Sequence, residues 1–192
     1  LFTEICRLLP DGQLGDPLFE YLRGQLERWP PNLGRPAPWR WVAGLLMGSG
    51  PRALELCNAL ELGGLRLEAN LLAPALSCEH LTRILYVNLS GNRLGPEGLR
   101  ALEVSGALPS LRHLILCDHQ LGDEGLEVLV GGTMLAQLRT LVWSRGQLSI
   151  EGIEALCGVA GDLALETLHV RGNTLGDEAI EVLVASELWE QL

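Results

Sequence analysis

The sequence from Ile84 to Leu192 repeats itself every 27 residues. Four copies open at residues 84, 111, 138 and 165, and they begin ILYVNLSGNRLGPEGLRAL, LRHLILCDHQLGDEGLEVL, LRTLVWSRGQLSIEGIEAL and LETLHVRGNTLGDEAIEVL. Apolar residues recur at positions 1, 4, 6, 11, 16 and 19 of every copy. The spacing of positions 4 and 6 predicts a strand, whereas the spacing of positions 16 and 19 predicts a helix. Each copy is therefore expected to be a strand, a tight turn and a helix that stacks on its neighbours.

These copies resemble the leucine-rich repeat family, whose signature LxxLxLxxNxL they match, with Asn92 and Asn173 at the asparagine position. The second half, LGxEGLxxL, is similar to the ribonuclease-inhibitor-like subclass, in which a full helix lies on the convex side. The resemblance implies an α/β solenoid, with a curved parallel β-sheet on the concave face and helices on the convex face. His119 and Gly146 occupy the asparagine position in the other two copies. We therefore expect the ladder of buried asparagines to be interrupted there, with looser or water-bridged turns.

The repeat register extends back over a degenerate copy, residues 57–83, in which Leu60, Leu62 and Leu67 keep the apolar positions. Residues 1–56 do not share the repeat. Helical apolar spacing near the start, Asp16 as a helix N-cap before Pro17, and a third helix after the prolines predict an N-terminal helical cap that protects the first strand. The expected organisation is a cap over 1–56 and repeats over 57–83, 84–110, 111–137, 138–164 and 165–191.

The C-terminal end shows no matching cap, because Leu192 falls where another repeat would open. We expect the outer edge of the last strand to pair with a continuation of the array or with a second copy of the chain.

Composition excludes several classes of protein. The 192 residues carry a net charge of -10, which disfavours binding to the phosphate backbone of nucleic acids. No apolar run is long enough to cross a membrane, and no secretion signal opens the sequence. Five cysteines lack CxxC pairs or regular spacing, so we expect reduced thiols in the cytoplasm. The basic residues are all arginine, which favours a bacterial gene of high GC content.

Strand residues that alternate with the buried leucines are expected to line the concave face and to bind a protein partner. They are Tyr86, Asn88, His113, Ile115, Cys117, Thr140, Val142, Ser144, Thr167, His169 and Arg171, flanked on the turns by Asp118 and Arg145. Four arginines on the strand side would favour an acidic partner: Arg112, Arg139, Arg145 and Arg171. The acidic residues of the helices are expected to be solvated and to offset the helix dipoles.

No catalytic, metal or cofactor site is predicted. Along an extended strand His113 lies roughly 13 Å from Cys117, and His119 lies beyond the following turn, so neither imidazole is placed to activate the thiol. The histidines lack ligand spacing, and the glycine-rich stretches lack phosphate-binding patterns.

The sequence thus predicts a non-catalytic protein–protein interaction scaffold that binds its partner on the concave face. Two alternatives stay open. The resemblance includes an activator of a small GTPase, for which Asp118, Arg145 and Arg171 are the candidate rim groups. The chain could also be the substrate-recognition part of a longer enzyme.

Overall fold

The computed structural model describes residues 2–9, 14–30 and 33–192, and its centre is a parallel sheet of five strands in chain order. The strands are β1 (Ala59–Glu61), β2 (Tyr86–Asn88), β3 (His113–Cys117), β4 (Thr140–Ser144) and β5 (Thr167–His169). Ala59 pairs with Tyr86, Tyr86 with His113, and His113 with Thr140. The repeat length of the sequence is therefore also the register of the sheet, and the degenerate first copy contributes a strand like the others.

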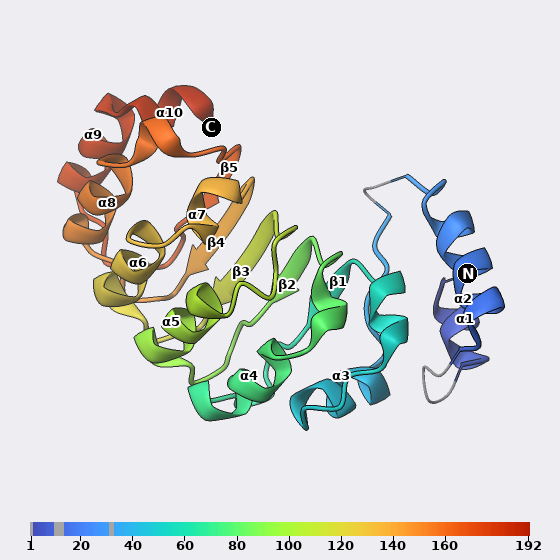
Figure 1. The fold of residues 1–192 in the computed structure, drawn as a ribbon. Coiled ribbons are helices and arrows are strands. Elements are labelled where there is room, and N and C mark those ends of the chain that lie inside the picture. Colours follow the sequence, from blue (N-terminus) through green and yellow to red (C-terminus); the bar gives the residue numbers. More distant parts are fainter. Residues whose placement is uncertain (1, 10–13, 31–32) are drawn as a thin grey trace.

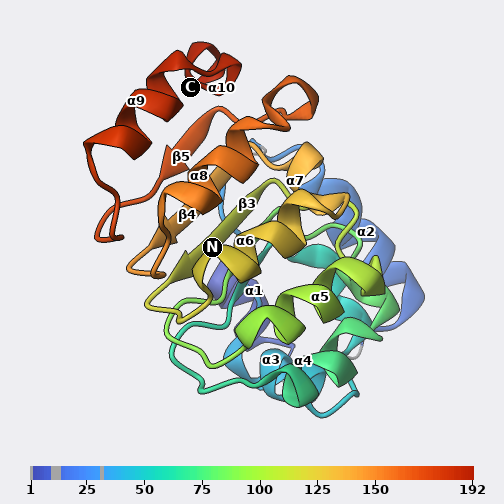
Figure 2. The ribbon, with the colours of Figure 1, turned by 90° about the vertical axis from the view of Figure 1, so that its left-hand side faces the viewer.

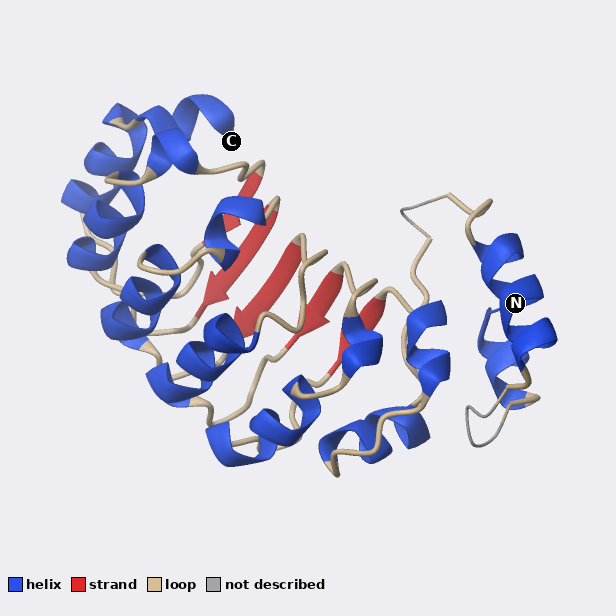
Figure 3. Cartoon of the chain, in the orientation of Figure 1, coloured by secondary structure: helices blue, strands red, loops and turns tan. Residues whose placement is uncertain are grey.

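A helix follows each strand on the outside of the sheet. These helices are α4 (Ala69–Leu76), α5 (Gly95–Ser105), α6 (Gly122–Val130), α8 (Ile150–Cys157) and α9 (Asp177–Ala185). Figures 1 and 3 show them along the outer side of an arc whose inner side is formed by the strands. Helices pack about 10 Å apart and strands about 4.8 Å apart, so the array curves toward the sheet. The predicted α/β solenoid, with its concave parallel sheet and convex helices, is confirmed.

Short helical turns lead from each helix to the next strand. They are η2 (Glu79–Leu81), α7 (Met134–Gln137) and η3 (Ala160–Asp162). The side chain of Glu103, at the end of α5, accepts hydrogen bonds from the backbone N–H groups of Thr133 and Met134 at 3.0 and 3.1 Å. It therefore supplies partners to the start of α7 in the next repeat.

The core lies between the sheet and the helices and consists mainly of leucine. Leu89, Leu116 and Leu141, which point outward from the strands, are buried, as are Leu99 and Leu126 of the helices. Complete burial of one such side chain stabilises the fold by about 1.5–3 kcal/mol. Each repeat obtains this burial only from its neighbours, so the stability of the array depends on stacking.

Trp143 takes the place that leucine or valine has in the other repeats and is 1% exposed. It has room because Gly146, three residues later, has no side chain. A Cβ atom built on Gly146 would lie 2.5 Å from Trp143 Nε1. The glycine at this asparagine position is thus explained by the large residue beside it.

The N-terminal region consists of α1 (Phe2–Arg7), α2 (Asp16–Leu26), α3 (Trp39–Leu46) and the 3-10 helix η1 (Arg52–Leu56). The free edge of β1 is covered by the linker before α3 and not by a helix. Ala37 N donates to Ala59 O at 2.9 Å, and Asn58 N donates to Arg35 O at 3.0 Å. The linker therefore acts as a short additional strand that satisfies the edge.

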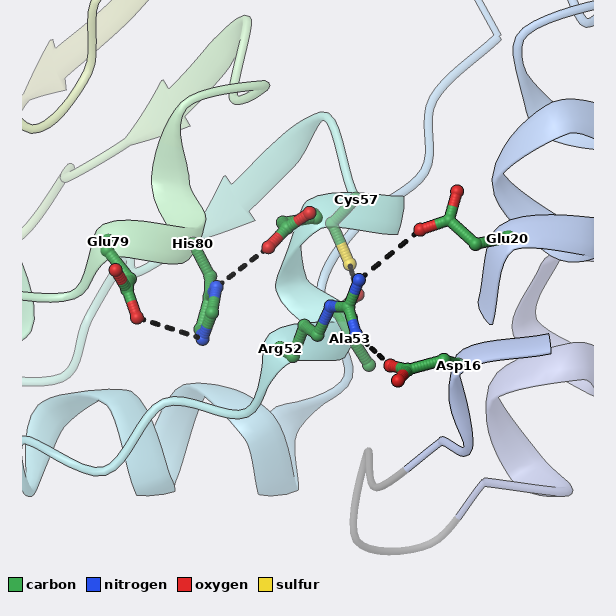
Figure 4. A network of polar contacts seen from close by, with 8 residues as sticks. Asp16, Glu20, Arg52, Ala53, Cys57, Glu79 and His80 are labelled. Carbon is green, nitrogen blue, oxygen red and sulfur yellow. Dashed lines mark hydrogen bonds and ion pairs between the residues drawn. The ribbon is translucent and has the colours of Figure 1, made fainter. Parts of the chain in front are cut away.

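A polar network, shown in Figure 4, fixes α2 to the start of the solenoid. The Arg52 guanidinium lies 4.0 Å from the centre of the Phe19 ring and forms ion pairs with Asp16 at 2.5 Å and Glu20 at 3.3 Å. Asp16 was predicted to be the N-cap of this helix, and that assignment is wrong. Gly15 is the N-cap, and the Asp16 carboxylate turns to Arg52 instead.

The C-terminal end has a short helix that the sequence did not predict. This helix, α10 (Glu187–Gln191), buries Leu188 completely and donates from Gln191 Nε2 to Ala160 O at 2.9 Å. Figure 2 shows it beside α9 at one end of the arc. The expectation of an end without any cap is wrong on this side, because α10 covers η3. The strand edge is different: within the described part of the chain, no strand pairs with the outer side of β5.

Candidate functional site

The concave face of the sheet carries two rows of side chains that the parallel register brings together. Tyr86, His113, Thr140 and Thr167 form the first row, and Asn88, Ile115, Val142 and His169 form the second. These residues are half-buried except His169, which is exposed, whereas the residues between them on β2, β3 and β4 are buried against the helices. The predicted binding residues therefore lie side by side on an accessible surface.

Polar side chains of this face are held by hydrogen bonds across the strands. His113 Nδ1 lies 3.0 Å from Thr140 Oγ1, and Asn88 Nδ2 donates to Glu61 Oε2 at 2.9 Å. The hydroxyl of Ser90 accepts from Cys117 N at 3.2 Å. Burial, followed by the positive charge of Arg139, lowers the pKa of His113 below its ordinary value. The imidazole is thus neutral at neutral pH.

One predicted contact residue is not available. Ser144 is only 7% exposed, because its short side chain lies between Cys117 and the turn that carries Arg171. Its inclusion among the partner-binding residues is wrong. Arg171, Asp118 and Arg145 are exposed at the rim where the strands end.

The rim itself is made by turns that share one backbone conformation. The eighth residue of each repeat is left-handed, with φ of 72° at Gly64, 67° at Gly91, 57° at Asp118, 52° at Arg145 and 73° at Gly172. This conformation is natural for glycine and unfavourable for the other two residues. The Arg145 guanidinium forms a two-pronged ion pair with the Asp118 carboxylate, and these hydrogen bonds lower the pKa of Asp118.

The charges of the strand side are mostly neutralised within the molecule. Arg139 forms an ion pair with Glu166, and Arg145 forms one with Asp118. Arg112 donates to the Leu111 carbonyl at 2.8 Å. An acidic partner that meets all four arginines is therefore not supported.

Sequence reasoning overlooked Glu61 and Glu166. Both could have been found by extending the repeat register, because Glu61 lies 27 residues before Asn88 and Glu166 lies 27 residues after Arg139. Glu61 belongs to the degenerate copy, where the signature is weak, and it was therefore left out of the concave face.

His119 replaces asparagine in the ladder and does not interrupt it. Its buried ring donates from Nε2 to Leu89 O at 2.7 Å, in the preceding repeat. Asn92 makes the equivalent bond to Leu62 O at 2.8 Å, and Asn173 makes it to Trp143 O at 2.7 Å. The expectation of a looser turn at His119 is wrong, because an imidazole N–H reaches the same carbonyl. Burial lowers the pKa of His119, which favours the neutral ring.

The turn at Gly146 is also satisfied, although glycine contributes no side chain. Asn173 Oδ1 accepts from Gly146 N at 2.8 Å and from Leu148 N at 3.2 Å. The next repeat thus supplies partners that this turn lacks. The expected water-bridged turn is replaced by direct hydrogen bonds.

No side chains converge for catalysis around Cys117 in the part of the chain that is described. The His113 ring is bonded to Thr140 and the His119 ring to the Leu89 carbonyl, so neither is bonded to the thiol. All five cysteines are free, and burial raises the pKa of Cys6 to about 11. Such a thiol is a poor nucleophile.

The described residues contain no group of three or more His, Cys, Asp or Glu side chains placed to hold a metal ion. None of the helices described is both long and apolar enough to cross a membrane.

Three stretches of the chain, residues 78–102, 107–130 and 164–184, match the family model for Leucine Rich repeat. A protein from Bacteroides fragilis of known crystal structure is similar, with a TM-score of 0.52 and 20% sequence identity over 68% of this chain and 39% of that chain. At this identity the similarity shows the fold alone, and this chain spans 39% of the length of that protein. No curated protein matches the sequence. The repeat at 138–164, with Trp143 and Gly146, lies outside the matched stretches, yet β4 keeps the register of the sheet.

Proposed function

Because this chain carries leucine-rich repeats and folds as a leucine-rich repeat solenoid, we propose that it is a non-catalytic protein–protein interaction scaffold. Leucine-rich repeats generally mediate protein–protein interaction. The proposed binding surface is the concave face between β1 and β5, together with the adjoining turn rim.

The open face of the sheet is the observation that carries this proposal. Parallel sheets in most proteins have both faces covered by helices. Here the helices lie along the convex side, and the side chains of the concave side remain half-buried or exposed. Ile115 and Val142 lie at the centre of this face, with His113, Thr140 and His169 around them. An apolar centre within a polar surround is the usual composition of a protein interface.

Variation along the register supports a recognition role for the same residues. The first row changes from Tyr86 through His113 to Thr140, while the buried position beside it is Val87, Leu114 and Leu141. Core packing requires the buried residues to stay apolar and does not constrain the exposed row. The exposed row is therefore free to specify a partner.

The proposal is tested by affinity capture from the source cell, followed by measurement of the affinity for the purified partner. The double substitution Val142→Arg with His169→Glu should weaken binding at least tenfold, about 1.4 kcal/mol, without lowering the melting temperature. The matched control is Glu127→Arg with Glu154→Arg, on the exposed side of α6 and α8, which should bind as the unchanged protein does. The opposite pattern would assign binding to the convex helices.

The structure gives less support to an activator of a small GTPase. Such an activator needs rim groups that reach into the GTPase, but Asp118 and Arg145 bind each other. No observation favours a substrate-recognition role in a longer enzyme. We propose a reducing compartment such as the cytoplasm, in keeping with the five free cysteines.

A further inference from the structure

A second feature of the concave face is a cavity of about 510 Å³ at its N-terminal end. Gly34 and Pro36 of the linker form one wall, and Glu61, Tyr86 and His113 of the first three strands contribute to its floor. This volume lies within the range of ordinary ligand sites, about 300–1,000 Å³. The cavity therefore has room for a large side chain of a bound protein.

The wall of this cavity is preformed. Asn58 is buried and joins the linker to the sheet, because its Oδ1 accepts from Arg35 N at 2.6 Å and its Nδ2 donates to Leu33 O at 3.1 Å. The bond from Ala37 N to Ala59 O adds a second attachment. Little ordering of the linker is required on binding, which favours affinity.

The only carboxylate that lines the cavity belongs to Glu61, and its charge is not compensated. The carboxylate accepts from Asn88 Nδ2, which is a neutral amide. The acids farther along the strand side differ, since Asp118 and Glu166 each have an arginine partner. Across residues 2–9, 14–30 and 33–192, no arginine or histidine forms an ion pair with Glu61. The cavity thus presents an unpaired negative charge.

The neighbours of Glu61 suit a cation with an aliphatic stem. Tyr86 lies beside the carboxylate, because burial and then the negative charge of Glu61 raise the pKa of its phenol. An aromatic ring next to a carboxylate attracts a cation through its face. Pro36, Ala59 and Leu85 offer apolar surface, on which the methylene groups of a long basic side chain pack well.

We propose that this cavity receives a lysine or arginine side chain of the protein partner, with Glu61 as its counter-ion. The proposal rests on the proposed function, since it identifies the chemistry of a partner bound to the concave face. The net charge of -10 acts in the same direction, because it draws basic partners toward the surface. The occupant is thus a basic segment, in contrast to the acidic one that the strand-side arginines suggest.

A blocked pentapeptide, acetyl-Gly-Ser-Arg-Ser-Gly-amide, serves as the probe, and the same peptide with citrulline in place of arginine is its neutral control. Titration of the full chain labelled with nitrogen-15 should shift the amide signals of Glu61, Tyr86 and His113 saturably with the arginine peptide. The substitution Glu61→Gln should weaken this binding at least tenfold. Glu127→Gln, an exposed acid on α6, is the matched control and should leave the affinity unchanged.

Equal binding of the citrulline peptide, or equal binding by the Glu61→Gln protein, would overturn the proposal. Shifts that map to the convex helices would overturn it too, because they would report general attraction to an acidic protein. Failure of the two proposals can be told apart with the purified partner. If Val142→Arg with His169→Glu abolishes binding and Glu61→Gln does not, the concave face remains the binding site and the basic side chain in the cavity is excluded.

Discussion

Asp118 and Arg145 occupy the same place in successive turns of the solenoid and bind each other through two hydrogen bonds. The Arg145 Nε and Nη2 groups donate to the two Asp118 oxygens, the second at 2.6 Å. Both residues have a left-handed backbone, with φ of 57° and 52°, where the other turns have glycine. An unfavourable backbone conformation and a favourable ion pair therefore meet at one site of the rim.

The first prediction is that Arg145→Gly raises the melting temperature. Both side chains of the ion pair are exposed, and exposed pairs contribute little to stability, whereas a left-handed backbone is costly for any residue with a Cβ. Asp118→Gly should raise the melting temperature less, because aspartate tolerates this conformation better than arginine. Calorimetry of the three proteins at one pH decides the matter, and a lower melting temperature for Arg145→Gly would show that the ion pair dominates.

The second prediction concerns acid. Burial lowers the folded-state pKa of His119 below its ordinary value near 6.5, so the unfolded chain takes up protons first as the pH falls. The contribution to stability is complete above about pH 6.5 and declines below it until the pH passes the lowered folded-state pKa. Urea unfolding between pH 7.5 and 5 should record this decline. The pKa of His113 is also lowered, so it adds a loss of the same sign.

A variant separates the contribution of His119. His119→Asn should keep the stability at pH 7.5 within about 1 kcal/mol, because asparagine makes the same carbonyl bond in Asn92 and Asn173. It should also lose less stability in acid than the unchanged protein does. His169→Asn, at an exposed position, is the control and should retain the full pH dependence. An unchanged acid loss in His119→Asn would contradict the assigned role.

The third prediction tests the packing of Trp143. A methyl group at residue 146 would lie 2.5 Å from Trp143 Nε1 and 2.7 Å from its Cδ1, and the buried indole has no room to move. Gly146→Ala should therefore cost about 1–3 kcal/mol in the free energy of unfolding. In a Trp143→Leu background the same alanine should cost less.

Gly24→Ala is the matched control for this substitution. Gly24 lies inside α2, and no atom is within 4 Å of a Cβ atom built there. This alanine should stabilise the protein by up to about 1 kcal/mol, because alanine favours a helix more than glycine does. Equal effects of the two alanines would mean that Trp143 does not fill the space at Gly146.

The sequence by itself determined the repeat unit, the faces of the sheet and its register. Leucine spacing alternates between strand and helix periods, and each unit can bury its leucines only against an identical neighbour. Pairs such as Tyr86 with His113 follow directly, because equivalent residues of stacked units must lie side by side. The concave location of Ile115, Val142 and His169 follows from the same alternation.

Only the tertiary structure decided which polar groups meet. The linker covers the edge of β1 because Arg35 and Ala37 happen to reach the backbone of that strand, and no local pattern encodes this pairing. Glu61 stays without an arginine while Glu166 has one, a difference that depends on the side chain 27 residues away in the neighbouring repeat. Apolar periodicity specifies which face is buried. Charge pairing depends on distances between units, which exist only once the units have stacked.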